Sequence, residues 1–174
     1  MKKFNLIGGN TLSSLSPYIH NFIFNKTNIN AEYSSINIRN VSHLREVIQN
    51  LQSGLIEGVN VTNPYKISII KYLDMLDISA KKIGAANCLS LEDDKLCGHN
   101  TDWFGFKKMI INHKINFNDK KIKIIGYGGA ALAVKYALED MGVEKINFYN
   151  RKKIGIDLLE LPSSLDDQSL VINA

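Results

Sequence analysis

The sequence lacks any run of apolar residues that approaches the roughly 18–20 needed to cross a membrane. The apolar stretch after Met1–Phe4 is also too short for the hydrophobic region of a secretory signal. The two cysteines, Cys88 and Cys97, form neither a CxxC pair nor another metal-ligand pattern. We therefore expect a cytoplasmic protein with no metal site and two free thiols, although a hairpin could bring the cysteines face to face.

The sequence also lacks a large excess of charge of one sign. The formal net charge is +4 and the pI is about 9.0. A mild positive excess suits anionic small molecules such as phosphates and carboxylates. The lysines are scattered and form no basic stripe interleaved with aromatic residues, so nucleic acid is a poor candidate partner. We expect a small-molecule substrate, with neither nucleic acid nor a membrane as partner. A homodimer is compatible with the sequence.

The length and hydrophobicity are those of a soluble globular protein. The chain has 174 residues, of which 45% are hydrophobic and 22% are charged. This is enough for one or two small domains with a real core. No internal repeat or low-complexity segment interrupts it.

Strand and helix patterns alternate through the first hundred residues. Ser16 is expected to cap a helix that has Pro17 in its first turn, and Ser42 to cap a second helix that stops at Gly54. Strands are expected at 3–7, 32–38 and 55–61, a helix at 64–76, and a hairpin of 88–91 with 96–99. This alternation predicts an α/β fold with a mostly parallel sheet.

The second part of the chain reads as a βαβ unit. A helix over 101–113 and a polar break at 116–120 precede it. We expect a strand at 121–125, a glycine turn at 126–129, a helix at 130–141, a strand at 143–149 and the start of another at 170–173. The domains are then 1–102 and 118–174, joined by 103–117.

A glycine pattern marks a nucleotide site. Gly126, Gly128 and Ala131 fit G-x-G-x-x-G/A between a predicted strand and a predicted helix. The first glycine permits a tight turn, the second lets the backbone approach a pyrophosphate, and the small third residue lets helix and strand pack closely. The helix start, at Gly129 and Ala130, offers free N–H groups and a partial positive charge. A plain glycine turn is the alternative.

The end of the following strand favours one cofactor. An NAD site usually has Asp or Glu there, which binds the ribose 2′-hydroxyl. This chain has Asn150, Arg151 and Lys152, and an arginine fork can hold a 2′-phosphate by paired hydrogen bonds. The sequence therefore predicts NADP(H) rather than NAD(H), and a solvated basic turn is the alternative.

Several segments together carry a family resemblance. They are Ser14-Leu15-Ser16-Pro17, Asn60-Val61-Thr62-Asn63-Pro64-Tyr65-Lys66, Gly84-Ala85-Ala86-Asn87, Gly98-His99-Asn100-Thr101-Asp102, Gly126-Tyr127-Gly128-Gly129-Ala130 and Asn150-Arg151. In order and spacing, over nearly the whole chain, they resemble the shikimate dehydrogenase family. The resemblance implies an N-terminal α/β substrate domain, residues 1–102, and a Rossmann-like NADP-binding domain, residues 118–174, that is incomplete.

The resemblance also implies roles for individual residues. Ser14 and Ser16 would hold the substrate carboxylate, Thr62, Asn87 and Asp102 would contact the ring hydroxyls, and Lys66 would be catalytic with Asp102 orienting it. A helix cap is the alternative role for Ser16.

The chemistry of Lys66 suits the role that the resemblance gives it. The side chain of a solvated lysine ordinarily has a pKa of about 10.4, so its ammonium can donate to a developing alkoxide. An adjacent carboxylate makes it a poorer base in the oxidation direction unless burial lowers its pKa, and the sequence leaves that balance open.

The implied activity is the NADPH-dependent, reversible reduction of 3-dehydroshikimate to shikimate, in chorismate and aromatic amino acid biosynthesis. A quinate/shikimate dehydrogenase and a non-catalytic ligand-binding remnant are the alternatives. Cys88, Trp103 and Leu132 depart from the family pattern, which commonly has Thr, a small residue and Arg there. The chain also stops where the family continues with further strands and helices. We therefore expect an incomplete gene or a trimmed chain rather than a natural minimal enzyme.

Overall fold

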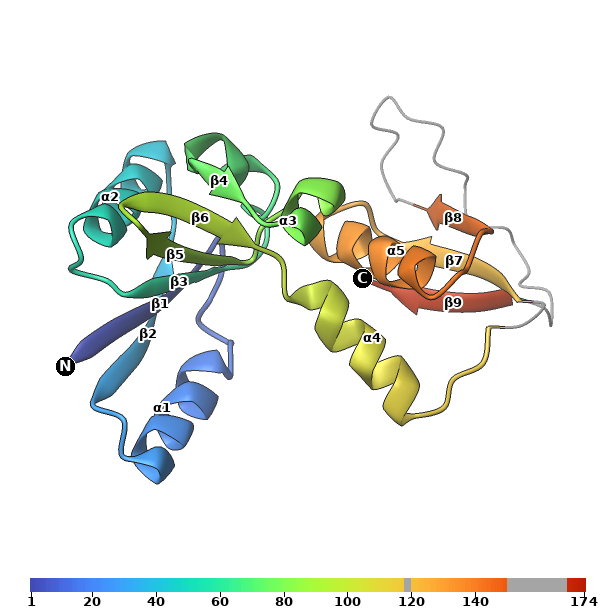
Figure 1. The fold of residues 1–174 in the computed structure, drawn as a ribbon, viewed down its shortest axis with the longest axis horizontal. Coiled ribbons are helices and arrows are strands. Elements are labelled where there is room, and N and C mark those ends of the chain that lie inside the picture. Colours follow the sequence, from blue (N-terminus) through green and yellow to red (C-terminus); the bar gives the residue numbers. More distant parts are fainter. Residues whose placement is uncertain (118–119, 150–168) are drawn as a thin grey trace. The chain divides into compact units, whose positions relative to one another are not determined.

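A computed structural model describes residues 1–117, 120–149 and 169–174. The chain forms two compact units, Met1–Asn100 and Thr101–Ala174 (Figure 1). Each unit has its own sheet and its own cluster of buried apolar side chains. The predicted α/β class is therefore confirmed.

The first unit is built on a six-stranded sheet in the order β2-β1-β3-β5-β6-β4. Strand β1 pairs in parallel with β2 and with β3, whereas β5 runs antiparallel to both β3 and β6. The short β4 pairs in parallel with β6. The strands are β1 (Lys2–Gly8), β2 (Ala31–Asn37), β3 (Gly58–Val61), β4 (Met75–Leu76), β5 (Cys88–Glu92) and β6 (Lys95–His99).

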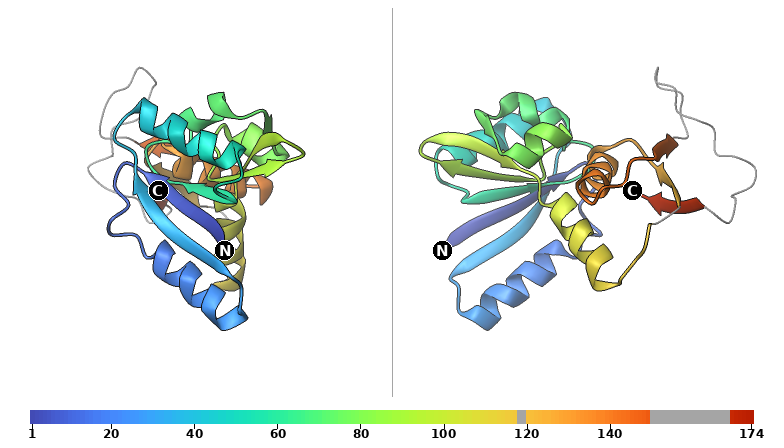
Figure 2. Two further views of the ribbon diagram at one scale, coloured as in Figure 1. Left: turned by 90° about the vertical axis from the view of Figure 1, so that its left-hand side faces the viewer. Right: turned by 45° about the vertical axis from the view of Figure 1, so that its right-hand side comes forward.

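Helices cover both faces of this sheet, with α1 (Ser16–Thr27) on one side and α2 (Val41–Gln52) on the other (Figures 1 and 2). The main core lies between α2 and the sheet, because apolar residues of α2 at helical spacing meet alternate residues of the strands. It includes Ile7, Leu44, Val47, Leu51, Val59, Val61, Leu89 and Leu96.

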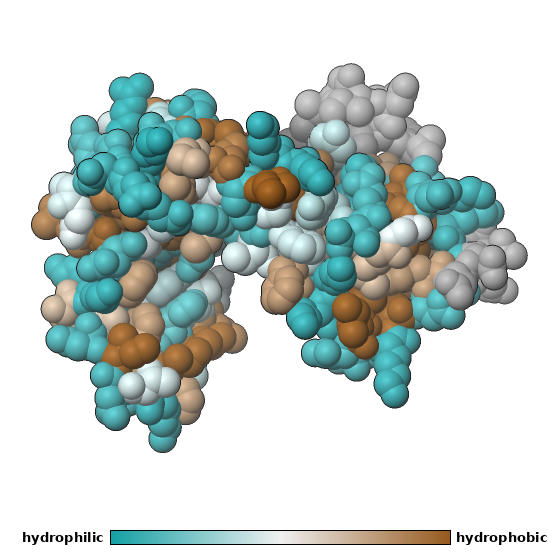
Figure 3. All heavy atoms as spheres, viewed as in Figure 1, coloured by the Kyte–Doolittle hydropathy of each residue, from teal (hydrophilic) through white to brown (hydrophobic). Residues whose placement is uncertain are grey.

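Helix α1 buries none of its residues completely. Its apolar side chains are about half exposed, and Figure 3 shows apolar surface over the part of the first unit where α1 lies. The exposed large apolar residues on this helix are Tyr18, Ile19, Phe22 and Ile23. The position of α1 therefore depends on the few contacts that it makes with the sheet.

The second unit is a parallel three-stranded sheet in the order β8-β7-β9, with helices α4 (Asp102–Asn112) and α5 (Gly129–Asp140). Its strands are β7 (Lys121–Ile125), β8 (Ile146–Tyr149) and β9 (Ser169–Asn173). Alternate residues Ile122 and Ile124 of β7 are fully buried together with Ala131, Val134 and Leu138 of α5. The strand, glycine turn and helix are confirmed close to their predicted bounds.

Both predicted helix caps are wrong. The N-cap of α1 is Leu15, whose apolar side chain makes no capping bond, and the hydroxyl of Ser16 accepts from the Ser14 hydroxyl instead. The N-cap of α2 is Asn40, whose Oδ1 accepts from the backbone N–H of His43 at 2.9 Å. Ser42 supports that cap by donating to the same Oδ1 at 2.7 Å. Neighbouring Ser and Asn are equally good caps, so sequence alone does not choose between them.

The predicted helix over 64–76 is also wrong. A short 3₁₀ helix spans Ser68–Tyr72, and the chain then extends into β4. Asp74 holds it there, because its backbone N–H donates to the carbonyl of Leu96 at 2.9 Å and its carboxylate accepts from the Leu96 N–H at 2.8 Å. Two such bonds to β6 compete with helix formation. The predicted strand 55–61 is shorter as well, since β3 begins at Gly58.

One helix, α3 (Ile78–Ile83), was not predicted. It begins at Asp77, whose side chain accepts from the backbone N–H of Ala80 at 2.5 Å. It ends at Gly84, which has a left-handed φ of 72°. The helix is only six residues long, too short for a periodic apolar pattern to reveal it.

The two cysteines are free thiols. The hairpin pairs Cys88 with His99 and Cys97 with Ser90, so the two sulfurs do not lie opposite each other. No helix among the described residues is long and apolar enough to cross a membrane. The described part of the chain also holds no group of three His, Cys, Asp or Glu side chains that could bind a metal ion.

We predict that Leu51→Ala lowers the free energy of unfolding by about 2–5 kcal/mol, because Leu51 is 1% exposed at the centre of the α2 core. Urea unfolding followed by far-UV circular dichroism measures this. The matched control is Leu55→Ala, at a leucine that is 66% exposed, and it should change the same free energy by less than about 0.5 kcal/mol. Equal effects of the two substitutions would contradict the assigned core.

Candidate functional site

The polar loops that carry the predicted substrate residues lie at one edge of the first sheet. The carboxyl ends of β1 and β3 share this edge because the two strands are parallel. Because β5 runs antiparallel to β3 and β6 antiparallel to β5, the start of β5 and the end of β6 reach the same edge. Ligands of α/β sheets commonly bind beyond the carboxyl ends of the strands. Ser14, Ser16, Thr62, Lys66 and Asn87 belong to loops at this edge.

The two predicted carboxylate-binding serines lie together in the loop after β1. The hydroxyl of Ser14 donates to the Ser16 hydroxyl at 3.1 Å and accepts from the Ser16 backbone N–H at 3.2 Å. Thr11 anchors the loop to the end of β2, because its N–H and its hydroxyl both donate to Asn37 Oδ1 at 2.7 Å. Two adjacent hydroxyls beside the start of a helix are donors that suit an anion.

The loop that carries Thr62 and Lys66 packs against the end of β1. The N–H of Thr62 donates to the carbonyl of Ile7 at 2.8 Å. Gly8 has to be small, because an added Cβ would overlap the methyl group of Thr62. The carbonyl of Lys66 accepts from the N–H of Ala86 at 2.8 Å, which brings the lysine backbone beside the segment that ends in Asn87.

Asn87 is fixed by its backbone on two sides. Its N–H donates to the carbonyl of His99 at 2.9 Å, and its own carbonyl accepts from the N–H of Val61 at 2.9 Å. The residue is 8% exposed. The predicted residues Thr62, Lys66 and Asn87 are thus joined through short backbone bonds. Asp102, by contrast, lies in the first turn of α4 and belongs to the second unit.

The side chain next to Asn87 is uncharged at neutral pH. Burial raises the pKa of the Cys88 thiol above its ordinary value, and the negative charge of Glu92 raises it further. Hydrogen bonds from Ser90 and His99 hold the pKa of the Glu92 carboxyl below its usual range. Cys88 therefore resembles, in charge and size, the threonine that is common at its position in the family.

Sequence reasoning assigned no role to Asn60, although it opens the segment that contains Thr62. The structure places its side-chain amide between Tyr33 and Asn87, where Oδ1 accepts from the Tyr33 hydroxyl at 2.8 Å and Nδ2 donates to the Asn87 carbonyl at 3.3 Å. Strand alternation was the available signal, because a polar residue between the buried Val59 and Val61 must face the other side of the sheet.

The glycine turn of the second unit has the geometry that the nucleotide pattern requires. Gly126 has a φ of 122°, and an added Cβ there would overlap the carbonyl oxygen of Ala174. A Cβ at Gly128 would meet open space, so the backbone is accessible from outside. Ala131 is fully buried between α5 and the sheet. These features fit a pyrophosphate at the start of the 12-residue helix α5, where Gly129 and Ala130 present their N–H groups.

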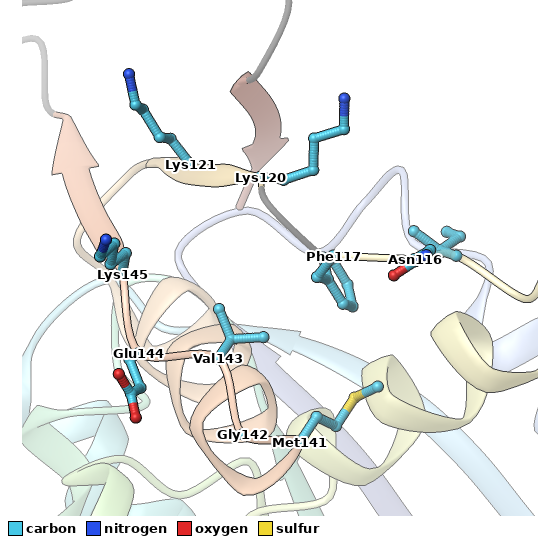
Figure 4. Close-up of a pocket in the computed structure, with 10 residues that line it drawn as sticks. Asn116, Phe117, Lys120, Lys121, Met141, Gly142, Val143, Glu144 and Lys145 are labelled. Atoms are coloured by element: carbon cyan, nitrogen blue, oxygen red, sulfur yellow. The ribbon is translucent and has the colours of Figure 1, made fainter.

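The residues expected to select the cofactor, Asn150, Arg151 and Lys152, lie outside the described residues. The described part of the second unit also holds a cavity of about 870 Å³, between the start of β7 and the loop from α5 to β8 (Figure 4). It is lined by Ile115, Asn116, Phe117, Lys120, Lys121 and residues 141–145. The glycine turn follows the opposite end of β7, so this cavity is separate from the nucleotide pattern.

Comparisons with known proteins identify the relatives of this chain. The family described as the shikimate dehydrogenase substrate binding domain matches residues 6–89. The shikimate dehydrogenase (NADP(+)) of Clostridium beijerinckii is 41% identical over 152 residues, which are 87% of this chain and 56% of that enzyme. The enzyme of the same name from Clostridium botulinum strain Hall is 36% identical over 178 residues, covering 97% of this chain and 69% of that one.

Solved structures give the same result. Shikimate dehydrogenase 1 from Peptoclostridium difficile superposes with a TM-score of 0.83 at 35% identity, covering 99% of this chain and 62% of that one. Shikimate 5-dehydrogenase from Thermus thermophilus, in complex with NADP(H) and shikimate, superposes with a TM-score of 0.77 at 29% identity, covering 87% and 57%. The chain spans about half the length of several of the curated relatives that it matches.

We predict that Gly126→Ala destabilises the second unit by at least about 1–3 kcal/mol, because alanine at this positive φ is strained and overlaps Ala174. Gly128→Ala is the control and should change the free energy of unfolding by less than about 1 kcal/mol, since its φ of −87° suits alanine. The fluorescence of the single tryptophan, Trp103, which packs edge-on against Tyr136 of α5, reports urea unfolding of this unit. A stable Gly126→Ala variant would refute the proposed constraint.

Proposed function

The chain belongs to the shikimate dehydrogenase family, and we propose that it carries out the NADPH-dependent, reversible reduction of 3-dehydroshikimate to shikimate. The observation that supports this most directly is the grouping of Ser14, Ser16, Thr62, Lys66 and Asn87 at one edge of the first sheet. The reaction belongs to chorismate and aromatic amino acid biosynthesis. The cytoplasm as its location stays a prediction, as does a homodimer.

The proposed substrate is a small carboxylic acid with hydroxyl groups on its ring. The sheet edge offers hydrogen-bonding groups for the carboxylate and for the ring hydroxyls. Ser14 and Ser16 would turn their paired hydroxyls to the carboxylate. Thr62 and Asn87 would bind ring hydroxyls, as the family resemblance implies, and backbone bonds leave little freedom to the segments that carry them. Preorganised donors of this kind bind at a lower entropic cost than mobile ones.

Lys66 is the proposed proton donor. NADPH, when bound, supplies the hydride that the carbonyl carbon of 3-dehydroshikimate accepts. The Lys66 ammonium donates a hydrogen bond, and then a proton, to the carbonyl oxygen, which becomes the hydroxyl of shikimate. Asp102 is assigned to the same reaction because Asn100, Thr101 and Asp102 match the family segment.

The cofactor would bind at the glycine turn. The N–H groups at Gly128, Gly129 and Ala130 are the proposed partners of the pyrophosphate, since α5 adds the positive end of its dipole there. Gly126 would shape the turn beside the pyrophosphate, because its own N–H donates to the carbonyl of Tyr149 at 2.8 Å. Asn150, Arg151 and Lys152 are proposed to hold the 2′-phosphate, which would select NADP(H) over NAD(H).

We predict that Lys66→Ala lowers the rate of NADPH oxidation with 3-dehydroshikimate by about 10²–10⁴-fold, the range expected when a general acid is removed. The control Lys71→Ala, at a lysine that lies 5.0 Å from the Tyr72 ring in the same unit, should leave the rate unchanged. A rate that survives in Lys66→Ala would disprove the assignment. Saturable shikimate binding without turnover by the unmodified chain would favour a ligand-binding remnant, and faster oxidation of quinate than of shikimate would favour a quinate/shikimate enzyme.

We also predict that Gly128→Ala raises the dissociation constant for NADPH by about tenfold or more, because its methyl group occupies the space through which the pyrophosphate reaches the backbone, and a charge-assisted hydrogen bond is worth about 1.5–3 kcal/mol. Fluorescence titration with NADPH measures this. Gly105→Ala in α4, where an added Cβ also meets open space, is the control and should bind NADPH normally. Equal affinities of the two variants for NADPH would mean that the cofactor does not bind at this turn.

A further inference from the structure

An array of polar and aromatic side chains lies behind the substrate edge of the first unit, on the face of the sheet that α1 covers. Tyr33 is its centre and is 4% exposed. In the strand register Tyr33 lies beside Phe4 of β1, and Asn60 of β3 lies beside Leu6 of the same strand. The phenol thus reaches across β1, and its hydroxyl donates to Asn60 Oδ1 at 2.8 Å.

This hydrogen bond sets the orientation of the Asn60 amide. Because Oδ1 accepts from Tyr33, Nδ2 is turned toward the carbonyl of Asn87 and donates to it at 3.3 Å. The same carbonyl accepts from the backbone N–H of Val61, the residue that precedes Thr62. Asn60 therefore ties the proposed substrate residue Asn87 to the strand that leads into Thr62 and Lys66.

Tyr33 is itself held by two consecutive residues of α1. The Asn21 side chain forms two bonds with the Tyr33 backbone, since Nδ2 donates to its carbonyl and Oδ1 accepts from its N–H, both at 2.8 Å. The ring of His20 stacks on the phenol, with centroids 4.2 Å apart and an angle of 10° between the planes. Because α1 begins at Ser16, these contacts also fix the helix that follows the two serines.

The phenol remains a donor over the whole physiological range. Burial raises the pKa of Tyr33 to about 12, and the neighbouring Cys88 contributes in the same direction. A neutral phenol can donate to Asn60 Oδ1, whereas a phenolate could not. The Tyr33 hydroxyl is therefore the donor of this bond at neutral pH.

We propose that Tyr33 is a positioning residue for the substrate site, acting through Asn60 on Asn87, and that His20 and Asn21 hold Tyr33 in place. The inference rests on the proposed function for its substrate, shikimate. It adds that the affinity for this substrate depends on a hydroxyl group on β2, a strand that β1 separates from β3 and from the proposed contacts Thr62 and Asn87. His20 has the role of stacking partner of this tyrosine.

The test is Tyr33→Phe, which removes the hydroxyl and keeps the ring that stacks on His20. We expect the dissociation constant for shikimate, measured by calorimetry, to rise about tenfold, because the Asn60 amide no longer holds Asn87 in its binding position and a small misplacement of a binding group weakens binding strongly. The dissociation constant for NADPH should not change. In a variant that turns over, the KM for shikimate should rise more than kcat falls.

The matched control is Ser34→Ala, at the next residue of the same strand. Ser34 accepts a hydrogen bond of 2.7 Å from the buried Asn5, but on the opposite face of the sheet, so its loss costs stability without reaching Asn60. Shikimate affinity should stay within about twofold of the unmodified chain. Equal losses of affinity in Tyr33→Phe and Ser34→Ala would overturn the proposal, because the effect would then be one of stability alone.

A double-mutant cycle separates the path through Asn60 from other effects. In an Asn60→Ala background, Tyr33→Phe should cause no further loss of shikimate affinity, whereas additive losses would overturn the proposal. The ligand-free chain gives an independent readout. The ¹⁵N–¹H signals of the Asn60 side chain and the Asn87 backbone should shift in Tyr33→Phe and not in Ser34→Ala. If these signals do not shift in Tyr33→Phe, the positioning role is overturned. Failure of the unmodified chain to bind shikimate would instead refute the proposed function.

Discussion

The parallel pairing of β1 with β3 is the constraint on which the candidate substrate site depends. It sends the serine loop after β1 and the Thr62–Lys66 loop after β3 to the same edge of the sheet. The antiparallel β5 then enters at that edge, so that Asn87 meets the end of β3 through a backbone bond to Val61. A shift of one residue in this register would turn Asn60 and its neighbours to the other face and separate these groups.

The second unit depends on a different constraint, the left-handed turn at Gly126 between β7 and α5. This turn brings the start of α5 against the end of the strand, where Ala131 is buried and Gly128 remains accessible. The two units therefore supply different chemistry. In the proposed function, the first would present hydroxyls, an amide and an ammonium to a small polar acid, and the second would present backbone N–H groups to phosphates.

Sequence reasoning found what depends on long patterns and missed what depends on single competing bonds. The strand, turn and helix over 121–141 were predictable because apolar periodicity and the glycine pattern agree there. The caps at Ser16 and Ser42 were wrong because neighbouring polar residues compete for the same N–H groups. The helix predicted over 64–76 was wrong because Asp74 forms a hydrogen bond with Leu96, which lies on a strand more than twenty residues away. Tertiary contacts of this kind leave no local signal.

The candidate site shows the same division. Ser14, Ser16, Thr62, Lys66 and Asn87 could be proposed from the sequence because their segments resemble a family in order and spacing. Tyr33 and His20 carry no such pattern, and their relation to Asn60 appears only when strand register and the α1 face are known. The array behind a binding site is therefore harder to predict than the site, since its members come from three separate elements.

The central claim is that the carboxyl edge of the first sheet binds shikimate, and ¹⁵N–¹H chemical shift mapping tests it most directly. During titration of the chain with shikimate, the account predicts the largest shifts at Ser14, Ser16, Thr62 and Asn87. The residues around the cavity of the second unit, such as Val143, should not respond. Saturable shifts at that cavity, with an unchanged sheet edge, would contradict the account.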